Sequence, residues 1–104
     1  MGSRLGEGAA LCNLGTAHQW LCEYPRAIDY HEQGLAIARA IGDRSGEGTA
    51  LFNLALAKET LGGYAEALEN AEACRKVYVE IEDPRASSVS ELAKRLRARL
   101  IPGR

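Results

Sequence analysis

The sequence is poor in the residues that build disulfide frameworks or cross membranes. It has three cysteines, Cys12, Cys22 and Cys74, and no Cys-x-x-Cys pair. An odd number of widely spaced cysteines argues against a disulfide framework and favours a reducing compartment, so we expect a cytoplasmic location. No apolar run approaches the length of a bilayer crossing, and no charged-then-apolar leader opens the chain. We therefore expect no membrane partner.

An excess of charge of either sign is also missing. The chain carries 13 Lys and Arg against 14 Asp and Glu, a formal net charge of −1. Residues 84–104 differ from the rest, because they hold six basic residues and one acid, but they contain no aromatic residue. We therefore expect no nucleic-acid partner, and interpret this segment as a solvated helix face, with an acidic protein surface as the alternative partner.

Motifs that carry chemistry are absent as well. The sequence contains no phosphate-binding glycine loop, nucleophile elbow or metal-binding helix motif. His18 and Cys22 are four residues apart and would share a helix face, but two ligands do not make a zinc site. We expect no enzyme activity, no metal and no cofactor.

What the sequence does contain is a repeat of forty residues. Residues 4–43 align with residues 44–83 without a gap, and fifteen aligned positions are identical. The identical pairs include Gly8 and Gly48, and Asn13 and Asn53. A period of roughly 20 to 50 residues indicates stacked supersecondary units, each of which buries its apolar face against a neighbour.

Each repeat is predicted to form two helices. Apolar residues at helical spacing predict a first helix over residues 4–21. Small residues such as Gly15 let this helix approach the next one closely, and the large side chains expected to fill the gaps in the core between them are Leu11, Leu14, Leu21 and Tyr24. A second helix is predicted to start near Tyr24, because Pro25 is tolerated only in the first turn of a helix. No segment shows the alternation of a half-buried strand, so we expect an all-α chain.

Residues 84–101 are predicted to form a fifth helix. Val89, Leu92 and Leu96 lie on one narrow stripe, while the basic residues lie elsewhere on the helix. A helix with one apolar face suits the end of a stack, because that face seals the last repeat and the other meets water.

Three motifs in each repeat carry a family resemblance. They are Leu11-x-x-Leu14-Gly15, Tyr24-x-x-Ala27 and His31 with Gly34 in the first, and Leu51-x-x-Leu54-Ala55, Tyr64-x-x-Ala67 and Ala71 with Cys74 in the second. They resemble the tetratricopeptide repeat family, in the forty-residue variety of the kinesin-light-chain and G-protein-modulator groups and of bacterial regulators. The resemblance implies one α-solenoid domain over residues 4–101. It would consist of two antiparallel helix-turn-helix repeats, 4–43 and 44–83, and a capping helix, 84–101.

The resemblance also implies a binding surface, because the first helix of each pair lines the concave side of such a solenoid. The groove residues carried over are Cys12, Asn13, Thr16, Gln19, Trp20, Thr49, Phe52, Asn53, Leu56, Glu59 and Thr60. The two asparagines could pair with the backbone of an extended peptide or bridge neighbouring helices. Trp20, Phe52 and Leu56 could form an apolar groove, or bury against an adjacent helix or a second chain.

We therefore expect a protein–protein interaction module that binds a peptide or helix of a partner protein. We also expect it to be the C-terminal piece of a longer adaptor or regulatory protein. Two alternatives stay open: homo-oligomerisation through the uncapped first helix, and sensing of a signalling peptide.

Overall fold

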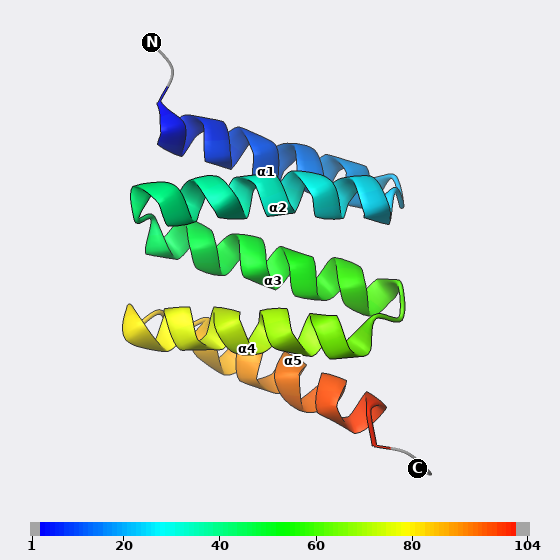
Figure 1. Cartoon of the computed structure of the whole chain (residues 1–104). Coiled ribbons are helices and arrows are strands. Elements are labelled where there is room, and N and C mark those ends of the chain that lie inside the picture. Colours follow the sequence, from blue (N-terminus) through cyan, green and yellow to red (C-terminus); the bar gives the residue numbers. More distant parts are fainter. Residues whose placement is uncertain (1–2, 102–104) are drawn as a thin grey trace.

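The computed structural model describes residues 3–101, and these residues form five helices and no strand. The helices are α1 (Arg4–Trp20), α2 (Tyr24–Ile41), α3 (Arg44–Thr60), α4 (Tyr64–Glu80) and α5 (Ala86–Arg99). They stack in chain order, with each helix packed on the next and α5 lying against α4 (Figure 1). The prediction of an all-α solenoid is confirmed.

Side-chain caps begin the first helix of each repeat. The Ser3 hydroxyl accepts a hydrogen bond from the backbone N–H of Gly6 at 3.4 Å, and the Asp43 carboxylate accepts one from Gly46 at 3.0 Å. Such caps satisfy backbone donors that the helix itself leaves unpaired. The predicted break ahead of Pro25 is also observed, since α2 begins at Tyr24.

The turns repeat even where the residues differ. Gly62 follows α3 with a φ of 84°, and its counterpart Cys22 follows α1 with a φ of 61°. Between repeats, Gly42 has a φ of 73°, and the equivalent Glu82 has a φ of 56°. A residue with a side chain is strained in this left-handed region, by about 1–2 kcal/mol. Packing of the helices therefore imposes the same turn on both repeats.

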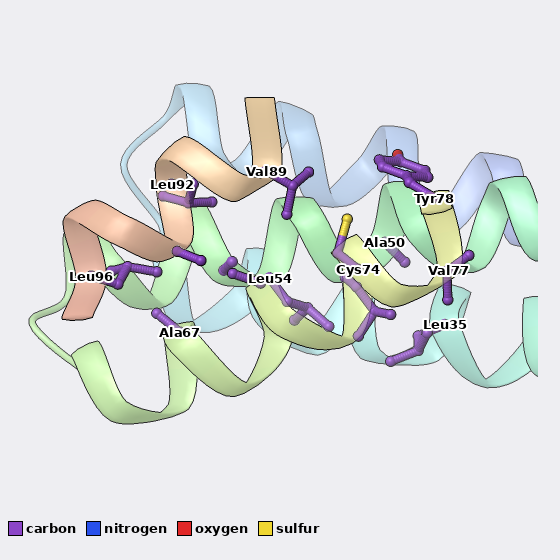
Figure 2. Packing of buried hydrophobic residues seen from close by; sticks show 14 residues of the cluster. Leu35, Ala50, Leu54, Ala67, Cys74, Val77, Tyr78, Val89, Leu92 and Leu96 are labelled. Carbon is purple, nitrogen blue, oxygen red and sulfur yellow. The ribbon is translucent and has the colours of Figure 1, made fainter. Parts of the chain in front are cut away.

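The main hydrophobic core is formed by residues of α2, α3, α4 and α5. Leu54 of α3 lies near its centre with Cys74 of α4, while Leu96 of α5 closes one end and Tyr78 lies toward the other (Figure 2). Burying a leucine fully contributes about 1.5–3 kcal/mol. The fully or nearly fully buried side chains of this cluster are Leu35, Ala50, Leu51, Leu54, Ala55, Ala67, Ala71, Cys74, Val77, Tyr78, Val89, Leu92, Ala93 and Leu96.

The prediction that Leu14 and Leu21 fill the core is wrong. Leu14 is 45% exposed and Leu21 is 67% exposed, whereas Leu54, the counterpart of Leu14, is completely buried. For Leu14 the reason is the order of stacking, because α3 has α2 before it but no described helix precedes α1. Leu21 lies just past the end of α1, and its counterpart Leu61 is likewise 53% exposed.

Helix α5 is held by apolar residues and by ion pairs to both neighbouring elements. Arg95 donates two hydrogen bonds to the Glu59 carboxylate of α3, and Arg97 donates one to Glu72 of α4. These arginines, interpreted from sequence as part of a solvated face, bind acids of their own chain. Arg104 lies outside the described residues. None of the helices within residues 3–101 combines the length and apolar character that a bilayer crossing requires.

Candidate functional site

The surface formed by α1 and α3, which we call the α1/α3 face, contains two hollows. The first hollow has a volume of about 310 Å³ and lies between α1, α2 and the start of α3. The second has a volume of about 380 Å³ and lies where the end of α1 meets α3. The second hollow is lined by Thr16, Gln19, Trp20, Cys22, Tyr24 and Asn53.

The two equivalent asparagines divide between these hollows. Asn13 lines the first hollow and is exposed, whereas Asn53 lines the second and is half-buried. Within residues 3–101, neither side-chain amide forms a hydrogen bond, so neither bridges neighbouring helices. Both amides are therefore available to a ligand lying along the face.

Trp20 is the most exposed large apolar residue of the face, with 84% of its surface accessible. Beside it, Gln19 is held in place, because its side-chain oxygen accepts a hydrogen bond from His31 Nε2 at 3.2 Å. Thr16 turns its hydroxyl back to the Cys12 carbonyl at 3.0 Å. The second hollow therefore has one exposed indole next to two side chains with fixed orientations.

Four of the residues predicted from sequence are engaged elsewhere. Phe52 and Leu56 are half-buried against the main core. Glu59 accepts hydrogen bonds from Arg95 at 2.7 and 2.8 Å, and this contact lowers the pKa of the carboxyl. Burial opposes the shift, and the charges of Arg95 and Arg99 add to it. Thr60 donates to the Leu56 carbonyl at 3.0 Å. Helix α5 thus takes up part of the α3 surface.

The wall of the first hollow includes two more predicted residues, Cys12 and Thr49. Burial, and to a smaller extent the charge of Asp43, raise the pKa of the Cys12 thiol, so it stays protonated and acts as an apolar wall. The Thr49 hydroxyl donates to the Ser45 carbonyl at 3.1 Å. Within residues 3–101 no group of three or more His, Cys, Asp or Glu could hold a metal ion.

Sequence reasoning missed the part of the first hollow that does not belong to first helices. Gly34 and Ala38 of α2 form its floor, and Asp43 and Ser45 line it from the start of α3. The alignment of the two repeats could have indicated this part of the hollow, because Gly34 and Ala38 align with the larger Cys74 and Tyr78 of the second repeat.

Comparison with known families places these helices in one of them. The family model described as tetratricopeptide repeat matches residues 6–78, which is more than half of the chain. The protein belongs to the tetratricopeptide repeat family, whose members generally mediate protein–protein interactions and are typically non-enzymatic scaffolds. No curated protein matches the chain.

Proposed function

We propose that the α1/α3 face binds an extended segment of a partner protein. The observation that carries this proposal is the pair Asn13 and Asn53, which occupy equivalent positions one repeat apart and line separate hollows of the same face. An asparagine amide offers donors and an acceptor, so it can pair with a peptide N–H and C=O whatever the peptide sequence. Two such amides would fix the path of the segment.

The exposed indole of Trp20 supports the same face. An amphipathic aromatic side chain at the centre of a binding surface contributes large contact area at low entropic cost, and such residues dominate binding energy in protein interfaces. Trp20 lines the hollow that contains Asn53, so a segment crossing both hollows passes the indole. We include in this proposal a role as an adaptor or regulatory module within a longer, cytoplasmic protein.

A display library of random twelve-residue peptides provides the test. The best enriched peptide is titrated calorimetrically into the wild-type chain, an Asn13→Ala/Asn53→Ala variant, and a Gln33→Ala control on α2. Losing one hydrogen bond at each asparagine costs about 0.5–1.5 kcal/mol per bond, so the double variant should bind roughly 5- to 150-fold more weakly, and the control should bind normally.

An unchanged affinity in the double variant rejects the proposal. Fluorescence gives an independent reading, because Trp20 is the sole tryptophan in the chain. The bound peptide should shift its emission. A spectrum that does not change at saturating peptide also argues against binding on this face.

A second candidate function, self-association, is favoured by one observation. Leu14 and Leu54 are identical residues at equivalent positions, yet the first is 45% exposed and the second is completely buried. We propose that the open side of α1 pairs with α1 of a second copy. Sedimentation velocity over a concentration series tests this, and a single monomeric boundary at high concentration refutes it.

A further inference from the structure

The two repeats differ in side-chain size at one position of their second helices, where α2 has Ala38 and α4 has Tyr78. Tyr78 of α4 is 1% exposed, and its ring lies against the backbone of Gly48. Figure 2 shows this ring at the opposite end of the core from Leu96. The Tyr78 hydroxyl lies 3.4 Å from the Thr49 hydroxyl, and the Arg85 guanidinium covers the ring at 4.6 Å from its centroid.

In the first repeat the position of Tyr78 is occupied by Ala38, and the space that the ring would fill is the first hollow. The counterparts of the three residues around Tyr78 all line that hollow: Gly8 for Gly48, Ala9 for Thr49 and Ser45 for Arg85. Gly34, the counterpart of Cys74, lines it too. The same helix-pair geometry therefore holds a ring in one repeat and an open space in the other.

The hollow has the size and the walls that an aromatic ring needs. Its volume is about 310 Å³, whereas a closed apolar cavity of about 150 Å³ already holds benzene. Gly8 lacks a side chain at this wall, as Gly48 does beside Tyr78, but the Ile37 side chain lies over it, 3.2 Å from where a Cβ would stand. A ring in the hollow would therefore pack on Ile37 as well as on Gly8 and Ala38. The short Ser45 stands at the repeat position of Arg85, the arginine that covers Tyr78, and the one arginine lining this hollow is Arg4 of α1.

We propose that the first hollow takes an aromatic side chain, phenylalanine or tyrosine, from the partner segment. The inference rests on the proposed function and deepens it. Asn13 lines the same hollow, so one residue of the partner can insert its ring while Asn13 pairs with the adjacent backbone. The bound ring takes the place in the first repeat that Tyr78 takes in the second.

Side-chain analogues test the hollow without a known partner. The probes are toluene and p-cresol, with 3-methyl-1-butanol as an aliphatic control, titrated into the full ¹⁵N-labelled chain. The aromatic probes should give saturable amide shifts centred on Gly8, Ala9, Ser45 and Gly46, and the aliphatic probe should bind at least five-fold more weakly. Scattered or non-saturating shifts overturn the proposal, as does equal binding of the aliphatic probe.

A variant that fills the hollow from within gives the second test. Ala38→Tyr installs the residue of the second repeat, and Ala40→Tyr, at an exposed site on the same helix, is the matched control. Ala38→Tyr should weaken p-cresol binding at least ten-fold, and the control should leave it unchanged. Equal binding by both variants overturns the proposal. If Ala38→Tyr does not fold, the wild-type shift map decides.

The two proposals fail separately. If p-cresol misses the hollow while display-selected peptides still depend on Asn13 and Asn53, the aromatic anchor is rejected and the binding face stands. If p-cresol binds in the hollow but peptide affinity does not depend on Asn13 and Asn53, the asparagine-based binding face is rejected and the aromatic site in the hollow stands.

Discussion

The imidazole ring of His31 lies directly against Gly15, so that a Cβ at Gly15 would be 2.6 Å from His31 Cε1. His31 is completely buried, and its Nε2 donates a hydrogen bond to Gln19. The second repeat has Ala55 and Ala71 at these two positions. Each repeat thus fills the same space between its helices, once with glycine and histidine and once with two alanines.

Adding a methyl group at Gly15 is therefore expected to destabilise the fold. Gly15→Ala forces a buried ring to move in a packed interior, and overpacking of this kind costs about 1–3 kcal/mol. The higher helix propensity of alanine offsets up to about 1 kcal/mol of that cost. Urea unfolding followed by circular dichroism measures the difference.

The control is the pair found in the second repeat. Gly15→Ala/His31→Ala should recover most of the stability lost in Gly15→Ala, because the added methyl group then meets no ring. Additive losses in the double variant would show that the two residues do not share one space.

Stability should also depend on pH through His31. Burial lowers the pKa of His31 below its ordinary value of 6.5. Below pH 6.5 the unfolded chain therefore binds a proton that the folded chain does not, so the free energy of unfolding falls as pH falls, by at most about 1.4 kcal/mol per unit. The full contribution is present above pH 6.5.

Unfolding at pH 5 to 8 checks this, with Gly15→Ala/His31→Ala as the comparison. The other histidine, His18, is present in both proteins. The lowered pKa values of Glu59 and Asp83 act in a more acidic range, below their ordinary values of 4.5 and 3.8. An equal pH slope in both proteins contradicts a role for His31.

The fold could be predicted from sequence because the duplicated pattern repeats every helix and turn. Burial could not be predicted from the same pattern. Identity between Leu14 and Leu54 suggests equal environments, but within the described residues α1 has one neighbouring helix fewer than α3. A small side chain at one repeat position also does not reveal whether the space beside it stays open. Ala38 lines an open hollow, whereas the ring of its counterpart Tyr78 is buried.

Apolar contacts, rather than ion pairs, should dominate the docking of α5. Leu96 is completely buried, so Leu96→Ala should cost about 2–5 kcal/mol. Arg95 is 57% exposed, so Arg95→Ala should cost less than about 1 kcal/mol despite its two hydrogen bonds to Glu59. Chemical denaturation of both variants, with the exposed Lys94→Ala as control, measures this order. The reverse order would mean that charge holds the helix.

The exposure of one side of α1 predicts that the equivalent residues Leu14 and Leu54 contribute unequally to stability. Leu54→Ala should cost about 2–5 kcal/mol, whereas Leu14→Ala should cost less than about 1 kcal/mol, because Leu14 is 45% exposed. Both are measured by urea unfolding at low protein concentration, where self-association is negligible. Similar losses at the two positions would show that Leu14 is covered.

The candidate site was predictable only in part. The repeat and the family resemblance place first-helix residues such as Asn13 and Asn53 on one face, and the hollows lie there. Phe52 and Glu59 satisfy the same positional rule, but contacts from the core and α5 engage them. The contact to Glu59 comes from α5, which lies outside the two repeats, so the position of Glu59 within its repeat cannot reveal it.

Mapping where a bound peptide lies tests the proposed binding on the α1/α3 face most directly. The display-selected peptide is titrated into the ¹⁵N-labelled chain, and amide shifts are followed to saturation. The largest shifts are expected on α1 and α3, including the start of α3 beside the first hollow. Shifts concentrated on the exposed surfaces of α2, α4 or α5 would contradict binding on this face.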